Sequence, residues 1–238
     1  MRRVLRAAAF TVLLLGTGGA RAEGRGASTG GFEVAFRSGV LVPLGDATAV
    51  YVDPDGDVYG EELSGLFGVQ FPLWLDLGYR FDQVFVGAYG QYAFGLAGRY
   101  LCWSPQSSCS TNAIRVGFEL QWHPFDWPAD QVQVDPWLGV GFGYEWASWR
   151  ISGTDPRSNT FQGWDFLRLG FGVDFGIADK LALGPFVECS LGQFSKVDFA
   201  YAAGGCTYCV NPETGSYDIQ RKALHFWLAF GLKLTWRP

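Results

Sequence analysis

Apolar and polar residues alternate along most of this chain with a period of two. The clearest example is the closing stretch ALHFWLAFGLKLTWRP, in which every second residue from Leu224 to Trp236 is apolar. The intervening positions are mostly small or polar and include His225 and Lys233. Because side chains of a β-strand point alternately to its two faces, the stretch predicts a long strand with one continuous apolar face.

The same alternation recurs and predicts eight strands in all. They span residues 32–42, 67–80, 84–96, 114–123, 138–146, 167–177, 181–193 and 224–236. These lengths reach the roughly 9–11 residues that a tilted strand needs to cross a bilayer. Pro72 and Pro185 predict local bulges, because proline cannot donate a hydrogen bond to a β-ladder.

Strands that cross a membrane must close into a barrel, since only closure satisfies every backbone hydrogen bond in lipid. A soluble, lipocalin-like barrel would show the same alternation, with its apolar face inside and its polar face toward water. A water-facing surface is normally rich in charged residues, yet the whole chain has only four lysines. The pattern therefore favours a membrane barrel whose apolar face points outward.

The polar phase of the strands carries glycine, alanine and isolated ions. The interior of an eight-stranded barrel is just wide enough for side chains to fill it, and a buried charge needs a partner. Six acids and five bases on this phase nearly balance, so we predict an interior ionic network. Its predicted members are Glu33, Arg37, Asp76, Arg80, Arg115, Glu119, Glu145, Arg168, Asp174, Glu188 and Lys233.

Aromatic residues gather at both ends of the predicted strands, as expected of a barrel with a belt at each membrane surface. One predicted belt contains Tyr92, Phe94, Tyr144, Trp146, Trp149 and Trp164, and the other contains Tyr79, Phe81, Trp122, Phe125, Trp127, Trp137 and Trp236. The connections alternate as well. Those at 43–64, 97–112, 152–163 and 195–222 are long, whereas those near 81–83 and 178–180 are tight. Short periplasmic turns and long external loops would place both termini in the periplasm.

The chain thus resembles the small bacterial outer-membrane barrels of the OmpA-transmembrane, OmpX and OmpW kind, over residues 31–236. Stretches such as LDLGYRFDQVFVGAYGQY carry the resemblance, which is one of pattern. It implies an all-β fold, an eight-stranded antiparallel up-and-down transmembrane barrel after a cleaved signal peptide. Members of that group usually end in an aromatic residue read by the barrel-assembly machinery, whereas here Trp236 is followed by Arg237 and Pro238.

The N-terminus predicts export. Three arginines precede the apolar run 7–15, and residues 20–22 form a small-x-small cleavage pattern. We expect a signal peptide at 1–22, a flexible periplasmic segment at 23–30 and an outer-membrane barrel domain at 31–238. Loss of residues 1–22 removes four arginines, leaving 14 Lys+Arg against 23 Asp+Glu, or 14 − 23 = −9. Such an acidic chain has no electrostatic basis for binding nucleic acid.

A short acidic motif in the first long connection resembles the start of a calcium loop. Residues 53–57 read DPDGD, which places the carboxylates of Asp53, Asp55 and Asp57 at alternate positions. The glycine falls at position four rather than six, and position twelve holds Ser64 where a bidentate glutamate belongs, although Glu61 or Glu62 could substitute. A solvated turn is the favoured interpretation, and calcium is the one cofactor that the sequence suggests.

Disulfides are chemically reasonable in an exported chain. We predict structural disulfides among Cys102, Cys109, Cys206 and Cys209, with 102–109 and 206–209 favoured and bridges between the two loops left open. A redox pair or a zinc site at 206–209 is disfavoured, because no helix start or second ligand pair accompanies it. Cys189 falls on the lipid phase of its strand and is predicted to be an inert apolar residue.

The sequence does not identify a reaction. His123 and His225 are the two histidines, and general-base catalysis would need a nucleophile within hydrogen-bond reach, which the same-face neighbours Ala223 and Trp227 of His225 do not provide. We expect a structural, adhesive or surface-interaction role carried by external loops above a filled interior. The alternatives are a narrow channel or carrier for small apolar molecules and a lipid-modifying enzyme. The expected partners are outer-membrane lipids and the barrel-assembly machinery, with the protein monomeric.

Overall fold

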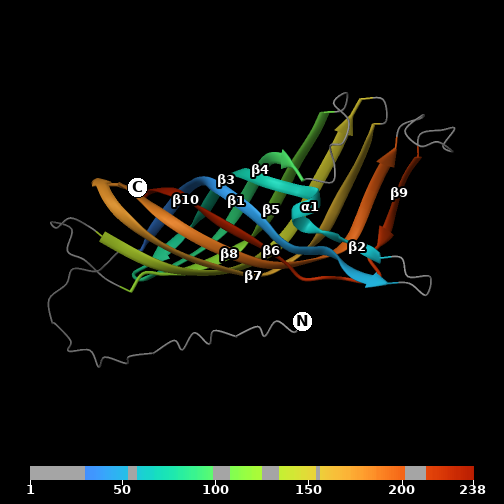
Figure 1. Ribbon diagram of the computed structural model, residues 1–238. Helices are drawn as coiled ribbons and strands as arrows, with labels where there is room; N and C mark the ends of the chain where they lie inside the picture. Colours follow the sequence, from blue (N-terminus) through green and yellow to red (C-terminus); the bar gives the residue numbers. More distant parts are fainter. Residues whose placement is uncertain (1–29, 53–57, 99–107, 125–133, 154–155, 202–212) are drawn as a thin grey trace, which may run out of the picture.

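The computed structural model describes residues 30–52, 58–98, 108–124, 134–153, 156–201 and 213–238. The predicted signal peptide at 1–22 and the acidic motif at 53–57 lie outside these ranges. Within them the chain is almost entirely β-strand (Figure 1). None of the helices formed by the described residues has the length and hydropathy needed to cross a membrane.

The described residues form ten strands and one short helix. They are β1 (Gly31–Val52), β2 (Val58–Glu62), α1 (Leu63–Leu66), β3 (Phe67–Phe81), β4 (Val84–Ala97), β5 (Ser108–Trp122), β6 (Val134–Ser152), β7 (Arg157–Ala178), β8 (Leu181–Tyr201), β9 (Glu213–Asp218) and β10 (His225–Trp236). Each of the eight predicted strands corresponds to one of β1, β3 to β8 and β10.

These eight strands form a closed antiparallel ring in the order β1-β3-β4-β5-β6-β7-β8-β10, and β10 then pairs with β1. Twelve residue pairs, from Val34 with Trp236 to Gly45 with His225, form the closing seam. The predicted eight-stranded antiparallel barrel is therefore confirmed. Strands β2 and β9 lie outside the ring, where β2 extends the pairing of β1 and β9 extends that of β8.

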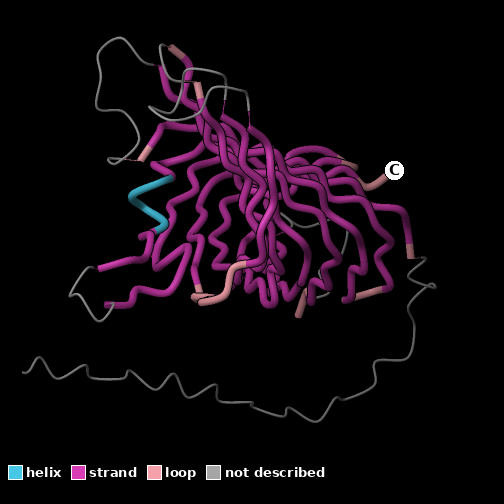
Figure 2. The backbone as a smooth tube through the Cα atoms, turned by 90° about the vertical axis from the view of Figure 1, so that its right-hand side faces the viewer, coloured by secondary structure: helices cyan, strands magenta, loops and turns pink. Residues whose placement is uncertain are grey.

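The two ends of the barrel differ. One end, which we call the turn end, holds the tight β3–β4 and β7–β8 turns, the start of β1 and the C-terminus. The Asp82 backbone adopts the left-handed conformation (φ 49°) in the first of these turns, a conformation that aspartate tolerates. At the opposite end, the loop end, strands β5 to β9 continue outward on one side as a projecting sheet (Figures 1 and 2).

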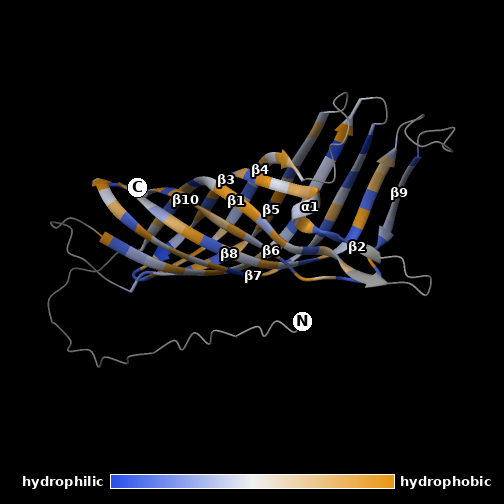
Figure 3. Ribbon diagram, in the orientation of Figure 1, coloured by the Kyte–Doolittle hydropathy of each residue, from blue (hydrophilic) through white to orange (hydrophobic). Residues whose placement is uncertain are grey.

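Side chains on the two faces of the ring differ sharply in chemistry. Outward positions of the strands are apolar and exposed, such as Leu73, Leu75 and Leu77 on β3 at 42–45%, whereas the alternate positions are buried. Figure 3 shows the resulting alternation of hydrophobic and hydrophilic bands along the ribbons. Because ionic side chains lie inside and the apolar ones outside, the soluble-barrel alternative is wrong.

Three details of the sequence prediction are wrong. At Pro72 and Pro185 pairing with one neighbouring strand is interrupted, yet it resumes in the same register, so neither proline causes a bulge. Trp137 and Trp149 are buried and do not belong to the aromatic belts, because they occupy the inward phase of β6. Much of the long connections at 43–64, 152–163 and 195–222 is strand, since pairing continues beyond the apolar band.

Candidate functional site

The charged side chains at the centre of the barrel form what we call the central cluster. Arg37 on β1 donates to Asp76 on β3 and to Glu119 on β5, both at 2.7 Å, and to Glu188 on β8 at 2.9 Å. Arg168 on β7 pairs with the second carboxylate oxygen of Glu188. All five residues are 8% exposed or less. A guanidinium suits this position, because its five N–H donors can serve several carboxylates at once.

A smaller group, the outer cluster, lies on the loop-end side of the central cluster. Arg115 on β5 donates to Glu145 on β6 at 3.2 Å, and the other carboxylate oxygen of Glu145 pairs with Nε2 of His225 on β10. The His225 ring stacks on Phe194 with centroids 4.2 Å apart, and the Arg115 guanidinium lies over Trp227. His225 is completely buried, so its contacts are those of a packed interior residue.

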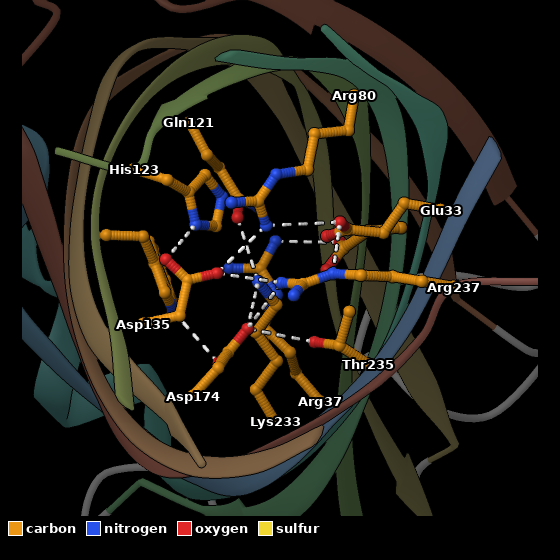
Figure 4. A network of polar contacts seen from close by, with 12 residues as sticks. Glu33, Arg37, Arg80, Gln121, His123, Asp135, Asp174, Lys233, Thr235 and Arg237 are labelled. Carbon is orange, nitrogen blue, oxygen red and sulfur yellow. Dashed lines mark hydrogen bonds and ion pairs between the residues drawn. The ribbon is translucent and has the colours of Figure 1, made fainter. Parts of the chain in front are cut away.

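A third group, the turn-end cluster, closes the opposite side of the interior (Figure 4). It comprises Glu33, Arg80, His123, Asp135, Asp174, Lys233 and Arg237, with Gln121 and Thr235 bonded to them. Asp135 accepts from Arg80 at 2.9 Å and contacts His123 Nδ1 at 3.0 Å. Lys233 donates to Gln121 at 2.8 Å and lies 3.4 Å from Asp174. Gln121 in turn donates to Glu119, which joins this group to the central cluster.

The structure brings all eleven predicted network residues to the inner face, in the three clusters just described. Ten of them are 8% exposed or less, and the Arg80 side chain at the rim is 18% exposed. Five further acidic, basic or histidine side chains belong to the interior but were not among the eleven: His123, Asp135, Asp165, His225 and Arg237. Asp135 and Arg237 share the parity of inward neighbours on their strands. Extending the predicted strands at 138–146 and 224–236 to include Asp135 and Arg237 would therefore have placed both side chains in the interior.

Asp165 is the one interior acid that alternation alone misplaces. The register of β7 shifts between Asp165 and Leu167 against β8 and between Asp165 and Arg168 against β6, which turns Phe166 and Leu167 outward together and Asp165 inward. Its carboxylate lies 4.0 Å from Arg168 Nε, and neither of its oxygens has a hydrogen-bond partner among the described residues. A bulge of this kind depends on how β7 pairs with its partner strands, so the sequence pattern of β7 alone does not predict it.

The loop-end part of the interior is apolar rather than ionic. Helix α1 turns inward, so that Leu63 is 0% and Leu66 is 6% exposed. They belong to one buried cluster with Trp149, Phe161 and Val197. Phe67 packs edge-on against Phe161 and Trp227 at about the same centroid distance, 6.2 and 6.1 Å. The first long connection therefore supplies a segment that fills the barrel interior at the loop end.

In the projecting sheet the polarity of the two faces is reversed. Ser148, Thr160 and Asp198 lie on its outward face, where Ser148 and Thr160 share a hydrogen bond at 2.9 Å. Lys196 contacts Asp198 at 3.1 Å, and a hydrogen bond from Ser216 lowers the pKa of Asp198. A polar outward face indicates contact with water or headgroups rather than hydrocarbon, so the apolar band ends below this sheet.

The cysteine and calcium predictions lie largely outside the described residues. Cys109 is disulfide-bonded, and Cys189 is the free cysteine of the described part, exposed on the outward face of β8. Cys102, Cys206 and Cys209 fall outside that part, as do Asp53, Asp55 and Asp57. Among the residues that are described, no group of three or more His, Cys, Asp or Glu side chains could hold a metal ion.

No family model matches the chain, and no curated protein matches it. Solved structures with a similar fold are small outer-membrane barrels. Neisserial surface protein A has 13% identity and a TM-score of 0.47, covering 89% of this chain and 100% of its own. The outer membrane proteins AlkL, solved in DMPC bilayers, and OprG from Pseudomonas aeruginosa each have 14% identity. Their TM-scores are 0.43 and 0.45, with 93% and 87% of this chain and 97% of each of theirs covered.

The interior clusters connect strands on different sides of the ring. From its position on β1, Arg37 contacts β5, which is three strands away in one direction around the ring, and β8, which is two strands away in the other. The central and turn-end clusters are linked by hydrogen bonds, and α1 fills the loop end. These side chains occupy the interior of the ring, as expected of an eight-stranded barrel, whose interior is just wide enough for side chains to fill.

Proposed function

We propose that the protein is a closed outer-membrane barrel that anchors a projecting sheet at the cell surface, where that sheet makes the functional contacts. The turn end faces the periplasm with both termini, and the chain reaches the membrane after export with its signal peptide. The observation that carries the proposal is the Arg37 hub, which three carboxylates from three strands hold across the middle of the barrel.

The closed interior predicts the electrical behaviour of the protein. We expect the refolded protein to show no stable conductance in planar bilayers, because ions would have to displace a network of buried ion pairs. The measurement is a current trace at several voltages, with a general porin reconstituted in the same way as the positive control. Reproducible open-channel steps at moderate voltage would contradict the proposal.

The surface-contact part of the proposal rests on the projecting sheet. On the loop-end part of its inner face, Phe199 packs against Tyr201 and Tyr217 at 5.4 and 6.1 Å, and Tyr217 is 53% exposed. In the described chain β9 pairs with β8 alone, which leaves its other edge able to accept a partner strand. Exposed aromatic side chains beside an open strand edge are typical of a surface that binds other molecules.

Adhesion to cells or to matrix proteins tests this part. We expect cells that display the Tyr201→Ser, Tyr217→Ser double variant to adhere less than cells with the unaltered protein. Lys196→Ser, on the outward polar face, is the matched control and should leave adhesion unchanged. Equal adhesion of all three at equal surface expression would exclude a role for these side chains.

A second candidate function is a carrier for small apolar molecules, which the buried leucines of α1 support. An apolar solute could occupy the loop-end part of the interior if Leu63 and Leu66 withdrew from it. Uptake of an apolar dye into liposomes that contain the protein distinguishes the candidates, since the closed barrel predicts no uptake above empty liposomes. A lipid-modifying activity would change the mass of lipid A, and the closed barrel predicts no change.

A further inference from the structure

Arg237, the residue after the last strand, reaches back into the barrel. Its Nε donates to Glu33 on β1 at 2.9 Å, and its Nη2 donates to Asp135 on β6 at 3.0 Å. Nη2 also lies 3.6 Å from Asp174 on β7. The backbone N–H of Arg237 donates to the carbonyl oxygen of Lys180, in the β7–β8 turn, at 2.9 Å. Arg237 therefore joins β1, β6, β7 and the β7–β8 turn. Figure 4 shows its side chain among those of Glu33, Asp135 and Asp174.

Charge at the turn end makes this arginine necessary. The carboxylates of Glu33, Asp135 and Asp174 gather there, and Arg237 is the one described cation that lies within 4 Å of all three. Without it, the shortest ion pair of Glu33 among the described residues would be the 3.8 Å contact with Arg80. The other oxygen of Glu33 already lacks a partner among the described residues, and Glu33 is 1% exposed. A buried carboxylate without a close cation is costly.

The contacts of Arg237 depend on closure of the ring. Arg237 follows β10, whose seam with β1 and pairing with β8 complete the barrel. Its side chain can meet residues of β1, β6 and β7 together only after β10 is in place. Interactions that form after the rate-limiting step slow unfolding without changing the folding rate. We propose that Arg237 is a clasp, which forms after ring closure and holds the closed barrel shut from the turn end.

The clasp predicts a specific kinetic change. In detergent micelles, Arg237→Gln should unfold in urea about tenfold faster than the unaltered protein or more, while its refolding rate changes less than about twofold. Arg157→Gln, an exposed arginine at the loop end, is the matched control and should change neither rate. Arg237→Lys keeps the charge but not the planar set of donors of arginine, so its unfolding rate should lie between those of the unaltered protein and Arg237→Gln. If the glutamine variant does not fold, the lysine variant provides the test.

Pairing with Glu33 provides a second test. If the two residues act through each other, Glu33→Gln and the double variant with Arg237→Gln should unfold at similar rates, instead of the single effects multiplying. An unchanged unfolding rate in Arg237→Gln, or slower refolding with unchanged unfolding, would overturn the clasp. These rates are independent of conductance and adhesion, so the clasp and the proposed function can fail separately.

Discussion

At the scale of the residue, Arg37 shows how a single buried cation organises the barrel. Its side chain is 1% exposed, and it also lies over Trp74 and Phe186, whose centroids are 5.6 and 5.7 Å away. The surrounding carboxylates come from strands far apart in sequence, such as Glu188, which is 151 positions away. The pairing of distant strands therefore determines which acids contact Arg37.

Substitution of Arg37 should be severely destabilising. Arg37→Met removes the cation but leaves three buried carboxylates, and loss of one member of a buried ion pair costs about 3–5 kcal/mol. We expect the free energy of unfolding, measured by urea titration in micelles, to fall by at least this amount, or the variant to fail to refold. Arg150→Met, at an exposed position of the projecting sheet, is the control. Equal free energies of unfolding for both variants would contradict this stabilising role of Arg37.

At the scale of the element, α1 shows how a connection becomes part of the core. It has only four residues and would not be stable alone, because helix nucleation is unfavourable and short helices are marginal in water. Three of its residues, Leu63, Gly65 and Leu66, are buried, and the backbone N–H of Gly98 donates to the carbonyl oxygen of Leu66 at 2.9 Å. Packing inside the loop end therefore stabilises this turn of helix.

Removing a leucine from α1 should leave a cavity in the apolar layer. Leu63→Ala is expected to lower the free energy of unfolding by about 2–5 kcal/mol, the range for fully buried leucines. Leu73→Ala on β3 is the matched control, since Leu73 is 42% exposed on the outward face and detergent can fill the space it leaves. Urea titration of both variants measures the difference, and an equal loss in the two would show that α1 does not pack inside.

At the scale of the whole molecule, close approach of the first and last strands closes the ring. Gly39 on β1 faces Gly231 on β10 across the seam. A Cβ atom at Gly39 would contact the carbonyl oxygen of Phe230 and lie 2.6 Å from the Cα atom of Gly231. Such a contact is with backbone, which cannot move aside without widening the seam. Glycine is needed here for space and not for a special backbone conformation.

Closure of the seam predicts the behaviour of the protein on a gel. The unaltered barrel, loaded without heating, should migrate differently from the heated protein. Gly39→Ala should lose this shift at a lower temperature, since overpacking typically costs about 1–3 kcal/mol. Gly90→Ala is the control, because a Cβ atom at Gly90 has open space around it. Identical transition temperatures for the two variants would contradict the steric argument for the seam.

The period of two in the sequence determines the eight strands and the polarity of both faces. Alternation is a property of each strand's own backbone, so every segment carries it independently. The same rule even indicates that Arg237 faces inward, since it shares the parity of Lys233 and Thr235, which are both buried. The predicted strand ends at Trp236, one residue before this position.

Tertiary structure alone decides which charges meet. The partners of Arg37 depend on which strands neighbour one another and in what register, and so does the bulge that turns Asp165 inward. The inward fold of α1 likewise depends on the apolar space that Trp149 and Phe161 create at the loop end. These features arise from contacts between distant segments. The sequence by itself therefore specifies an apolar outside and an ionic inside, and the closed ring decides how that inside is filled.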